Sequence, residues 1–481
     1  MKTKILTLLF LFVFILLDVQ AQEATKKWTL QECVKVAIEN NLKVKRGVYN
    51  VENYRINNLQ NGMAFLPTVN SGGSYGQNYG RALNPVTNSY INRNSNTINL
   101  QANLSLTLFN GLRLQNSFRQ SMIDYDASNE DLNKTKNDVI LNIVTSYINV
   151  IFSKELYENS RFQLNSSQQQ VDRIKKQVDA GSLPMSNLLN QEAQVATNEV
   201  NMINQENALN LAMLQLKQAM QLPASTPMEI DIPEIPINDL IISSTPEQIY
   251  EIALNTMPEI KSATLKVKSA EYNLKANRGN LYPRLSFNAS AASNYSSVSN
   301  VARYITAPDG SVSLTKTPIG QVDSSTPVYG YVPNTQLISN NYSQQDQLKD
   351  NLFKGLTFQL TVPIFNGLQS RLAVRRSFIS RELAAVTVTE TQNTLRQSIE
   401  TAYNDAISAS KAYSSSLKQV SAREEAYRMT KQRFDNGAAN FVEYNIAEND
   451  LFQAKSDLTR AKYNFIFKKK ILDFYQGIQI D

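Results

Sequence analysis

The sequence predicts a mixed α/β membrane protein in which one structural plan occurs twice. Residues 109–216 can be laid over residues 365–472 without a gap, so that every matched pair is separated by 256 positions. A second segment repeats at a separation of 216 positions, where Thr29 matches Thr245. Self-similarity over such long periods takes precedence over local patterns when a fold is assigned. We therefore expect two structural repeats, each made of strands and long helices.

The first 21 residues have the features of a secretory signal peptide. Lys2 and Lys4 precede an apolar run from Ile5 to Leu17, and small residues ending at Ala21 stand where a signal peptidase would cut. This apolar run is short for a bilayer span, and no other segment approaches about 18 uninterrupted apolar residues. We therefore expect an exported protein whose mature chain has no transmembrane helix.

Composition argues against several classes of function. The 481 residues include no histidine, which removes the commonest general base and the commonest zinc ligand. The single cysteine, Cys33, allows no intrachain disulfide and is expected to be a small buried residue of the first helix. Without Lys2, Lys4 and Asp18, the totals of 48 basic and 42 acidic residues leave a net charge of +5, with no basic run. We therefore expect no enzyme active site, no metal or other cofactor and no nucleic-acid partner.

Alternating apolar and uncharged polar residues predict a strand over 97–108. Even-numbered positions are apolar and odd-numbered positions are polar, because successive side chains of a strand point to opposite faces. Residues 356–364 show the same pattern, 285–291 form a clear partner, and 69–79 are a weaker candidate. Strands of about ten residues with one apolar face suit a tilted bilayer span. Since four strands leave open edges, several chains would have to close one barrel.

Helical periodicity follows each strand hairpin. Residues 112–178 contain neither proline nor glycine, which predicts a helix of roughly 100 Å. Asp179-Ala180-Gly181 and Asp435-Asn436-Gly437 then end two equivalent helices, with glycine supplying the left-handed turn. The returning helix of the second half has the alternating steps of four and three of a coiled coil, at Ala447, Leu451, Ala454, Leu458, Ala461 and Phe465. Each half therefore predicts a long antiparallel helical hairpin.

These signals divide the chain into four segments. They are a signal peptide at 1–21, a first repeat at 22–222 with its strand hairpin at about 67–110, a proline-rich linker at 223–244, and a second repeat at 245–478 with its strand hairpin at about 283–366. The second hairpin carries 40 additional residues, mostly within 293–347, where Asn, Ser, Pro and Gly predict a long loop. Long loops on one side are typical of outer-membrane barrels, so we expect this loop outside the cell.

The ordered combination resembles the TolC family of outer-membrane efflux proteins over essentially the whole mature chain. The resemblance rests on strand ends reading Leu-Phe-Asn-Gly-Leu or Ile-Phe-Asn-Gly-Leu, on Leu66-Pro67 and Tyr282-Pro283, and on the segment 433–444. It implies a homotrimer whose twelve-stranded β-barrel, with four strands per chain, is continued by a long periplasmic α-helical barrel. It also implies a passive exit duct of a tripartite efflux or type I secretion system in the outer membrane of a Gram-negative bacterium. The implied partners are outer-membrane lipids, a periplasmic adaptor (membrane fusion) protein and an inner-membrane pump of the resistance-nodulation or ABC type.

The resemblance places candidate site residues in three groups. They are the strand-to-helix junctions at Phe109, Asn110, Gly111, Phe365, Asn366 and Gly367, the helix-to-strand bends at Pro67 and Pro283, and the periplasmic tip at Asp179, Gly181, Asn187, Asp435, Gly437 and Glu443. Members of the family commonly narrow the duct at the tip with polar links and carboxylates. Here the second half keeps an acid, Glu443, whereas the first half has Asn187. One ring of carboxylates is therefore expected rather than two, although Asp435 and Glu443 also suit a role as helix-terminal charges.

One alternative from a different class stays open at this point. The chain could be a non-conducting periplasmic coiled-coil scaffold or a surface adhesin, with its strands packed on a soluble core. An enzyme is disfavoured by the missing histidines and by the lack of a clustered acid pair or a phosphate-binding loop. The sequence does not indicate which substrate is exported.

Overall fold

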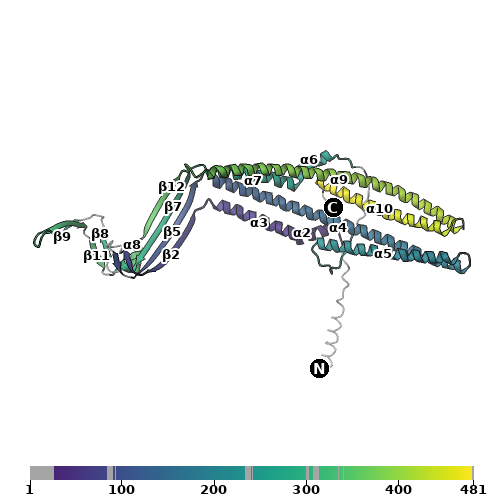
Figure 1. Ribbon diagram of the computed structural model, residues 1–481, viewed down its shortest axis with the longest axis horizontal. Helices are drawn as coiled ribbons and strands as arrows, with labels where there is room; N and C mark the ends of the chain where they lie inside the picture. The colour runs from purple at the N-terminus through teal and green to yellow at the C-terminus, as the bar shows by residue number, and fades with distance from the viewer. Residues whose placement is uncertain are drawn as a thin grey trace, which may run out of the picture. The chain divides into compact units, whose positions relative to one another are not determined.

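The computed structural model describes residues 27–83, 90–92, 94–232, 240, 242–299, 303–306, 314–333, 335–339 and 341–478, so the predicted signal peptide lies outside the described residues. The chain forms two compact units. The first comprises residues up to 56, 122–269 and 381 onward, and the second comprises 57–121 and 270–380. Four helices contribute residues to both units, namely α3 (Leu42–Met63), α4 (Arg113–Asp179), α7 (Pro258–Gly279) and α9 (Gln369–Asp435) (Figure 1).

Helices of the two halves have equal lengths pair by pair. The pairs are α2 (Leu30–Asn40) and α6 (Pro246–Thr256) with 11 residues, α3 and α7 with 22, α4 and α9 with 67, and α5 (Met185–Ala219) and α10 (Phe441–Tyr475) with 35. Paired helices begin 216 or 256 positions apart, which are the two separations found in the sequence. The two halves therefore share these four helices in the same order.

The short helices α2 and α6 begin with the same cap. The Thr29 hydroxyl accepts from the Glu32 N–H at 3.3 Å, and the Glu32 carboxylate accepts from the Thr29 N–H at 3.2 Å. Thr245 and Gln248 form the equivalent pair, and Pro246 occupies the first helical position. Because an isolated 11-residue helix is marginal in water, these caps and the burial of one face fix where each helix forms.

The second unit contains a four-stranded antiparallel sheet in the order β12-β7-β5-β2. Its strands are β2 (Thr68–Asn78), β5 (Ser95–Phe109), β7 (Arg284–Ser296) and β12 (Phe353–Thr361). On one face, Leu104 pairs with Val69 and Ala289. On the other face, Asn103 lies between Asn70 and Ser290. The register thus collects mainly apolar residues on one face and mainly uncharged polar residues on the other, with Lys354 and Arg284 as charged exceptions near the two ends of the sheet.

Two details of the strands differ from the sequence-based expectation. Alternation in β5 stops one residue early because Thr107 pairs with Ser286 and Phe109 with Leu285, which leaves Leu108 in a β-bulge. The strand expected to continue to residue 364 ends at Thr361. Pro363 follows closely, and proline has no N–H for a ladder hydrogen bond.

Neither face of this sheet is covered by the part of the chain that the structure describes. Only Ser95 is buried among the four strands, and Val69, Leu356 and Phe358 are 67%, 75% and 68% exposed. β2 and β12 are the two edges of the sheet. A soluble sheet packed on a core, which is the alternative raised above, would bury one of these faces. The uncovered apolar face instead suits contact with lipid.

The connection between β7 and β12 is more regular than the loop that we expected. It contains two antiparallel pairs, β8 (Arg303–Thr306) with β11 (Thr335–Ser339) and β9 (Leu314–Gln321) with β10 (Pro327–Pro333), followed by helix α8 (Gln344–Asp350). The buried Gln347 ties α8 to the sheet, since its side-chain carbonyl accepts from the Ser296 N–H at 3.0 Å. The corresponding connection of the first half contains β3 (Arg81–Leu83) paired with β4 (Tyr90–Asn92).

The core of the first unit has two apolar clusters. One joins α2, α4, α5 and α10 and includes Cys33, Ile143 and Leu216, while the other joins α6, α7, α9 and α10 around Ile399. Burial of Cys33, as expected, raises the pKa of its thiol to about 12. In the first cluster, the Tyr147 hydroxyl contacts backbone carbonyls beside β1 (Lys27–Trp28) and its parallel partner β6 (Glu229–Ile230). The linker thus contains a short strand six residues after its start, and most of its later residues lie outside the described ones.

Within the described ranges, α4 is also the one helix long and apolar enough to cross a membrane, judged by length and composition. Of its most apolar 18-residue stretch, 39% is buried. Ile143, Val150 and Ile151 of this helix belong to the core cluster. Packing in that core is therefore sufficient to explain its apolar residues.

Candidate functional site

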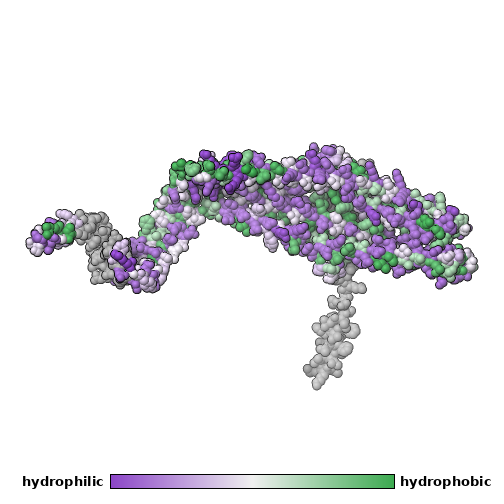
Figure 2. Space-filling model, in the orientation of Figure 1, coloured by the Kyte–Doolittle hydropathy of each residue, from purple (hydrophilic) through white to green (hydrophobic). Residues whose placement is uncertain are grey.

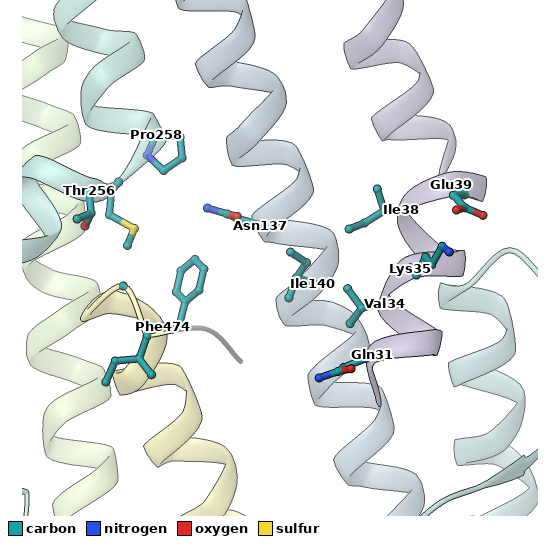
Figure 3. A pocket seen from close by; sticks show the side chains of 13 residues that line it. Gln31, Val34, Lys35, Ile38, Glu39, Asn137, Ile140, Thr256, Pro258 and Phe474 are labelled. Atoms are coloured by element: carbon teal, nitrogen blue, oxygen red, sulfur yellow. The ribbon is translucent and has the colours of Figure 1, made fainter. Parts of the chain in front are cut away.

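A cavity of about 800 Å³ lies in the first unit between α2, α4, the corner of α6 and α7, and the end of α10. Its walls include Val34, Ile38 and Ile140, while Lys35 and Glu39 lie on the outer side of α2 (Figure 3). No group of three or more Cys, Asp or Glu side chains suited to a metal is present in the described ranges. The cavity coincides with none of the residues that the sequence analysis selected. The candidate site is therefore sought at the strand-to-helix junctions and at the ends of the helical hairpins.

Both strand-to-helix junctions have the same backbone conformation. Gly111 and Leu112 have φ values of 65° and 63°, and Gly367 and Leu368 have 63° and 64°. Two consecutive left-handed residues turn the chain sharply from strand to helix, and α4 and α9 each begin at the next residue. Glycine adopts this conformation without strain, whereas the same conformation costs leucine about 1–2 kcal/mol. Contacts with the surrounding structure therefore have to hold Leu112 and Leu368 in this conformation.

The asparagines of the junctions support these turns. The Asn110 side-chain carbonyl accepts from the Leu114 N–H at 3.3 Å, and the Asn366 amide donates to the Ser370 hydroxyl at 2.6 Å. Phe109 is the last residue of β5, whereas Phe365 lies beyond β12 and is exposed. The structure thus places Phe109 at the end of β5 and the other five predicted junction residues between a strand and a long helix.

Gly111 also makes a close backbone contact that Gly367 lacks within one chain. A Cβ atom at Gly111 would lie 2.4 Å from the carbonyl oxygen of Gly279, the last residue of α7. No atom of the described chain lies within 4 Å of a Cβ built at Gly367. At the same end of the sheet as these junctions, Pro67 and Pro283 stand directly before β2 and β7. Their fixed φ directs the chain from helix into strand.

The two helical turns at the predicted tip are closed in the same way. Gly181 and Gly437 have φ values of 72° and 74°, with no atom within 4 Å of a built Cβ. The Gly181 N–H donates to Val178 O at 2.8 Å and the Ser182 N–H donates to Gln177 O at 2.9 Å, which is a Schellman ending. The second turn repeats both hydrogen bonds. These glycines are therefore required by the backbone conformation alone.

Two charged residues predicted for the tip, Glu443 and Asp435, are paired with arginines of the same chain. Glu443, the third residue of α10, donates its N–H to the Asn440 side chain at 2.8 Å and lies 3.6 Å from the Arg433 guanidinium. Asp435, at the end of α9, lies 3.7 Å from Arg173 of α4. Asn187 has the place of Glu443 in the first hairpin and donates its N–H to Pro184 O. Asp179, the last residue of α4, is exposed. Such half-exposed pairs are each worth about 1 kcal/mol or less.

A row of side-chain hydrogen bonds joins α4 of the first hairpin to α10 of the second. Its members are Asn159 with Thr459 at 3.3 Å, Gln163 with Asn449 at 3.3 Å, and Ser166 with Glu448 at 3.1 Å. Next to the turns, Ile174, Leu188 and Phe441 form a small apolar cluster. The sequence analysis did not anticipate this polar contact between the hairpins.

Glu448 was missed because it replaces an apolar residue in the seam of α10. The expected seam is only partly right, since Leu451, Ala454 and Phe465 are buried but the other three residues are half-buried. Toward the turn, the buried row continues through Glu448, Tyr444 and Phe441. Read from Phe441 to Leu451, the steps are 3, 4 and 3. The spacing alone would have revealed this row, had polar residues been allowed in it.

Together, a sheet with an uncovered apolar face and two long helical hairpins define a subunit of an outer-membrane channel with a periplasmic part. The chain matches the family described as outer membrane efflux protein over residues 33–220 and 249–468, and it belongs to that family. It is accordingly a protein of the outer membrane.

Similar proteins share little sequence identity with this chain, and a solved structure among them has a similar fold. The chain is 22% identical to the outer membrane efflux protein BepC of Brucella suis over 84% of this chain and 75% of BepC. It is also 22% identical to the solvent efflux pump outer membrane protein SrpC of Pseudomonas putida, over 91% of this chain and 83% of SrpC. The outer membrane protein VceC of Vibrio cholerae has a similar structure, with a TM-score of 0.70 and 12% identity over 94% of this chain and 97% of VceC.

Proposed function

We propose that three copies of this chain form a passive exit duct for a tripartite efflux or type I secretion system. The observation that carries the proposal is the four-stranded sheet, whose edges β2 and β12 are open and whose apolar face is uncovered. A bilayer does not tolerate open edges, so β12 of one copy pairs with β2 of the next. Three copies supply twelve strands, whereas four strands are fewer than the about eight of the smallest usual barrels.

The helices support the same ring. In the second unit α4 contacts α3, since Ser121 bonds to Asn58, and in the first unit it contacts α7, since Asp131 pairs with Lys266. α9 is the counterpart of α4, and α3 is the counterpart of α7. A neighbouring copy can therefore place its α3 against α9 as α7 lies against α4. The first third of α9 is rich in exposed apolar residues such as Leu383 (Figure 2). Such a head-to-tail contact closes into a ring when the rotation fits.

The ends of the helical hairpins suit docking of a periplasmic adaptor. Each returning helix begins with two exposed apolar residues spaced by four, Met185 with Leu189 in α5 and Val442 with Ile446 in α10. Residues with this spacing lie on one helical face, which is the pattern of a helix-in-groove or coiled-coil contact. An adaptor bound there would connect the duct to an inner-membrane pump of the resistance-nodulation or ABC type. The pump would select the cargo, and the duct itself would have no catalytic site.

The test of this function is the mass and conductance of the purified protein. In detergent, the mature chain is expected to be a trimer, and in planar bilayers it is expected to conduct ions. A monomer without conductance would contradict the proposal. Extraction separates it from a periplasmic scaffold, because a barrel remains with outer membranes through a high-salt wash whereas a peripheral protein is released.

The connection between β7 and β12 is expected to lie outside the cell. Ser324, in the turn between β9 and β10, is exposed and far in sequence from the strands of the sheet. In a Cys33→Ser background, Ser324→Cys should react with an impermeant maleimide on intact cells, and Ala180→Cys at a helical turn should not. Labelling of Ala180→Cys alone would invert the topology.

Glu443 is expected to give the duct a moderate preference for cations. Three copies around the axis would concentrate negative charge at the narrow end, although Arg433 offsets part of it within each chain. Glu443→Gln should shift the reversal potential in a salt gradient toward anions, and Asn187→Glu should shift it toward cations by adding a second ring. If neither change alters selectivity, the two positions face solvent or the adaptor rather than the channel.

A further inference from the structure

Glu448 is the one carboxylate side chain that is buried among the described residues, with 6% of its surface exposed. It lies in α10, toward the turn that joins this helix to α9. Its counterpart in the first repeat, 256 positions earlier, is Glu192 of α5, which is exposed. The chain therefore places the same residue type at equivalent positions in two environments.

The buried carboxylate connects three helices. Its Oε1 accepts from the Ser166 hydroxyl of α4 at 3.1 Å and from the Tyr444 hydroxyl at 3.3 Å. The Tyr444 hydroxyl also lies 3.1 Å from the Tyr427 hydroxyl of α9. The Tyr444 ring stacks on Phe434 with centroids 5.0 Å apart. Glu448 is thus one of the three points in this polar row at which the first hairpin bonds to the second.

Charged and polar groups around Glu448 act on it from each packed helix. Burial raises the pKa of this carboxyl, and it outweighs the opposing hydrogen bonds from Ser166 and Tyr444 and the positive charges of Lys431 on α9 and Arg173 on α4. In the same region of the bundle, α5 contributes the neutral Gln191, whose amide donates to Ser167 O at 3.2 Å. No neighbour therefore fully compensates the ionised form.

A raised pKa in the packed bundle has a defined consequence for stability. The neutral carboxyl favours the packed state, so this contribution is fully present below the ordinary pKa of a glutamate and is lost as the pH rises through the raised value. An ionised Glu448 gains hydration when the hairpins separate. The contact between the hairpins is thus weakened by deprotonation.

The interface around Glu448 also contains buried polar groups whose hydrogen bonding is incomplete. Gln170 Nε2 of α4 and Gln191 Oε1 of α5 are buried without a hydrogen-bond partner in the described structure. Each unpaired buried group costs about 1–3 kcal/mol. The apolar contact near the turns is limited to a small cluster around Ile174, Leu188 and Phe441. A change at one carboxyl can therefore shift the balance between packed and separated hairpins.

We propose that Glu448 is a proton-sensitive latch between the two helical hairpins. The neutral carboxyl keeps α10 packed on α4, and the ionised carboxylate releases it, so the hairpin ends separate more readily as the periplasm becomes less acidic. This opening acquires a transport role only through the proposed duct function, whereas the latch itself is a property of a single chain.

Hydrogen exchange of the purified protein tests the latch without requiring conductance. Peptides covering 441–454 should exchange faster, relative to intrinsic rates, at neutral than at mildly acidic pH. Glu448→Gln keeps an acceptor for Ser166 and Tyr444 but cannot ionise, so it should slow exchange at neutral pH by about tenfold for each pH unit that separates the packed and free pKa values. Glu192→Gln, the matched control, should behave like the wild type. An unchanged pH response in Glu448→Gln would overturn the proposal.

A second variant guards against a simple folding defect. Tyr444→Phe keeps the stacked ring but removes one donor to the ionised carboxylate, so the pH midpoint of opening should move upward. A midpoint that stays in place would also overturn the latch. Conductance measured on the same samples separates the two proposals. Normal exchange behaviour without conductance would contradict the duct and leave the latch intact, whereas conductance with no pH response would do the reverse.

Discussion

Phe358→Arg is expected to abolish assembly of the protein in the outer membrane. Phe358 lies in the middle of the edge strand β12, on the apolar face, and is 68% exposed within the chain. An arginine facing lipid near the midplane costs about 2–4 kcal/mol per chain. In a trimer the same cost occurs three times, about 6–12 kcal/mol in total, which is comparable to a typical stability margin of about 5–15 kcal/mol. The measurement is the amount of trimer recovered from outer membranes after a high-salt wash.

The neighbouring residue provides the control for this change. Gln359 is on the polar face of the same strand, so Gln359→Arg adds the same charge where the duct would be filled with water. This variant should assemble and should change only ion selectivity. Equal loss of trimer in both variants would show that the apolar face does not contact lipid. It would favour a sheet whose apolar face is covered by another protein.

Gly111→Ala is expected to destabilise the assembled protein by about 2–5 kcal/mol. Part of this cost is the left-handed backbone, about 1–2 kcal/mol for a residue with a Cβ atom. The rest is overpacking, since the new atom would lie 2.4 Å from Gly279 O and 2.9 Å from Tyr282 Cβ. The temperature at which the purified trimer dissociates should fall accordingly.

Gly181→Ala separates the two contributions. Gly181 has a similar φ of 72°, but no atom lies within 4 Å of a built Cβ. Its replacement by alanine therefore costs only the free energy of the left-handed backbone. The fall in dissociation temperature should therefore be clearly larger for Gly111→Ala. Equal falls would mean that the end of α7 moves aside at the junction without cost.

The parts of the fold that the sequence predicted are those set by long, regular periods. The stretch without proline or glycine anticipated a helix at 112–178, and α4 spans Arg113–Asp179. The alternation over 97–108 anticipated β5 up to the bulge at Leu108. In both cases the signal came from many residues that agree, so one exception does not hide it.

Features that depend on contacts between distant residues could not be predicted in this way. The bulge at Leu108 follows from pairing with β7, which is almost 180 residues away in sequence. The short strands between β7 and β12 are hidden by a turn-rich composition. Glu448 was overlooked as a site residue because a charged side chain breaks an apolar pattern, and only its partners Ser166 and Tyr444 explain its burial. The roles of the tip residues in conduction stay predictions.

The open edges of the sheet have a consequence for inheritance. The outer edges of β2 and β12 can pair only with strands of other copies. A single defective copy therefore impairs the whole ring that contains it. A variant that damages one edge and leaves the other intact would still be incorporated and would leave the ring unclosed. Produced beside the wild-type protein, such a variant should therefore act dominantly, whereas a variant that fails to fold at all should be recessive.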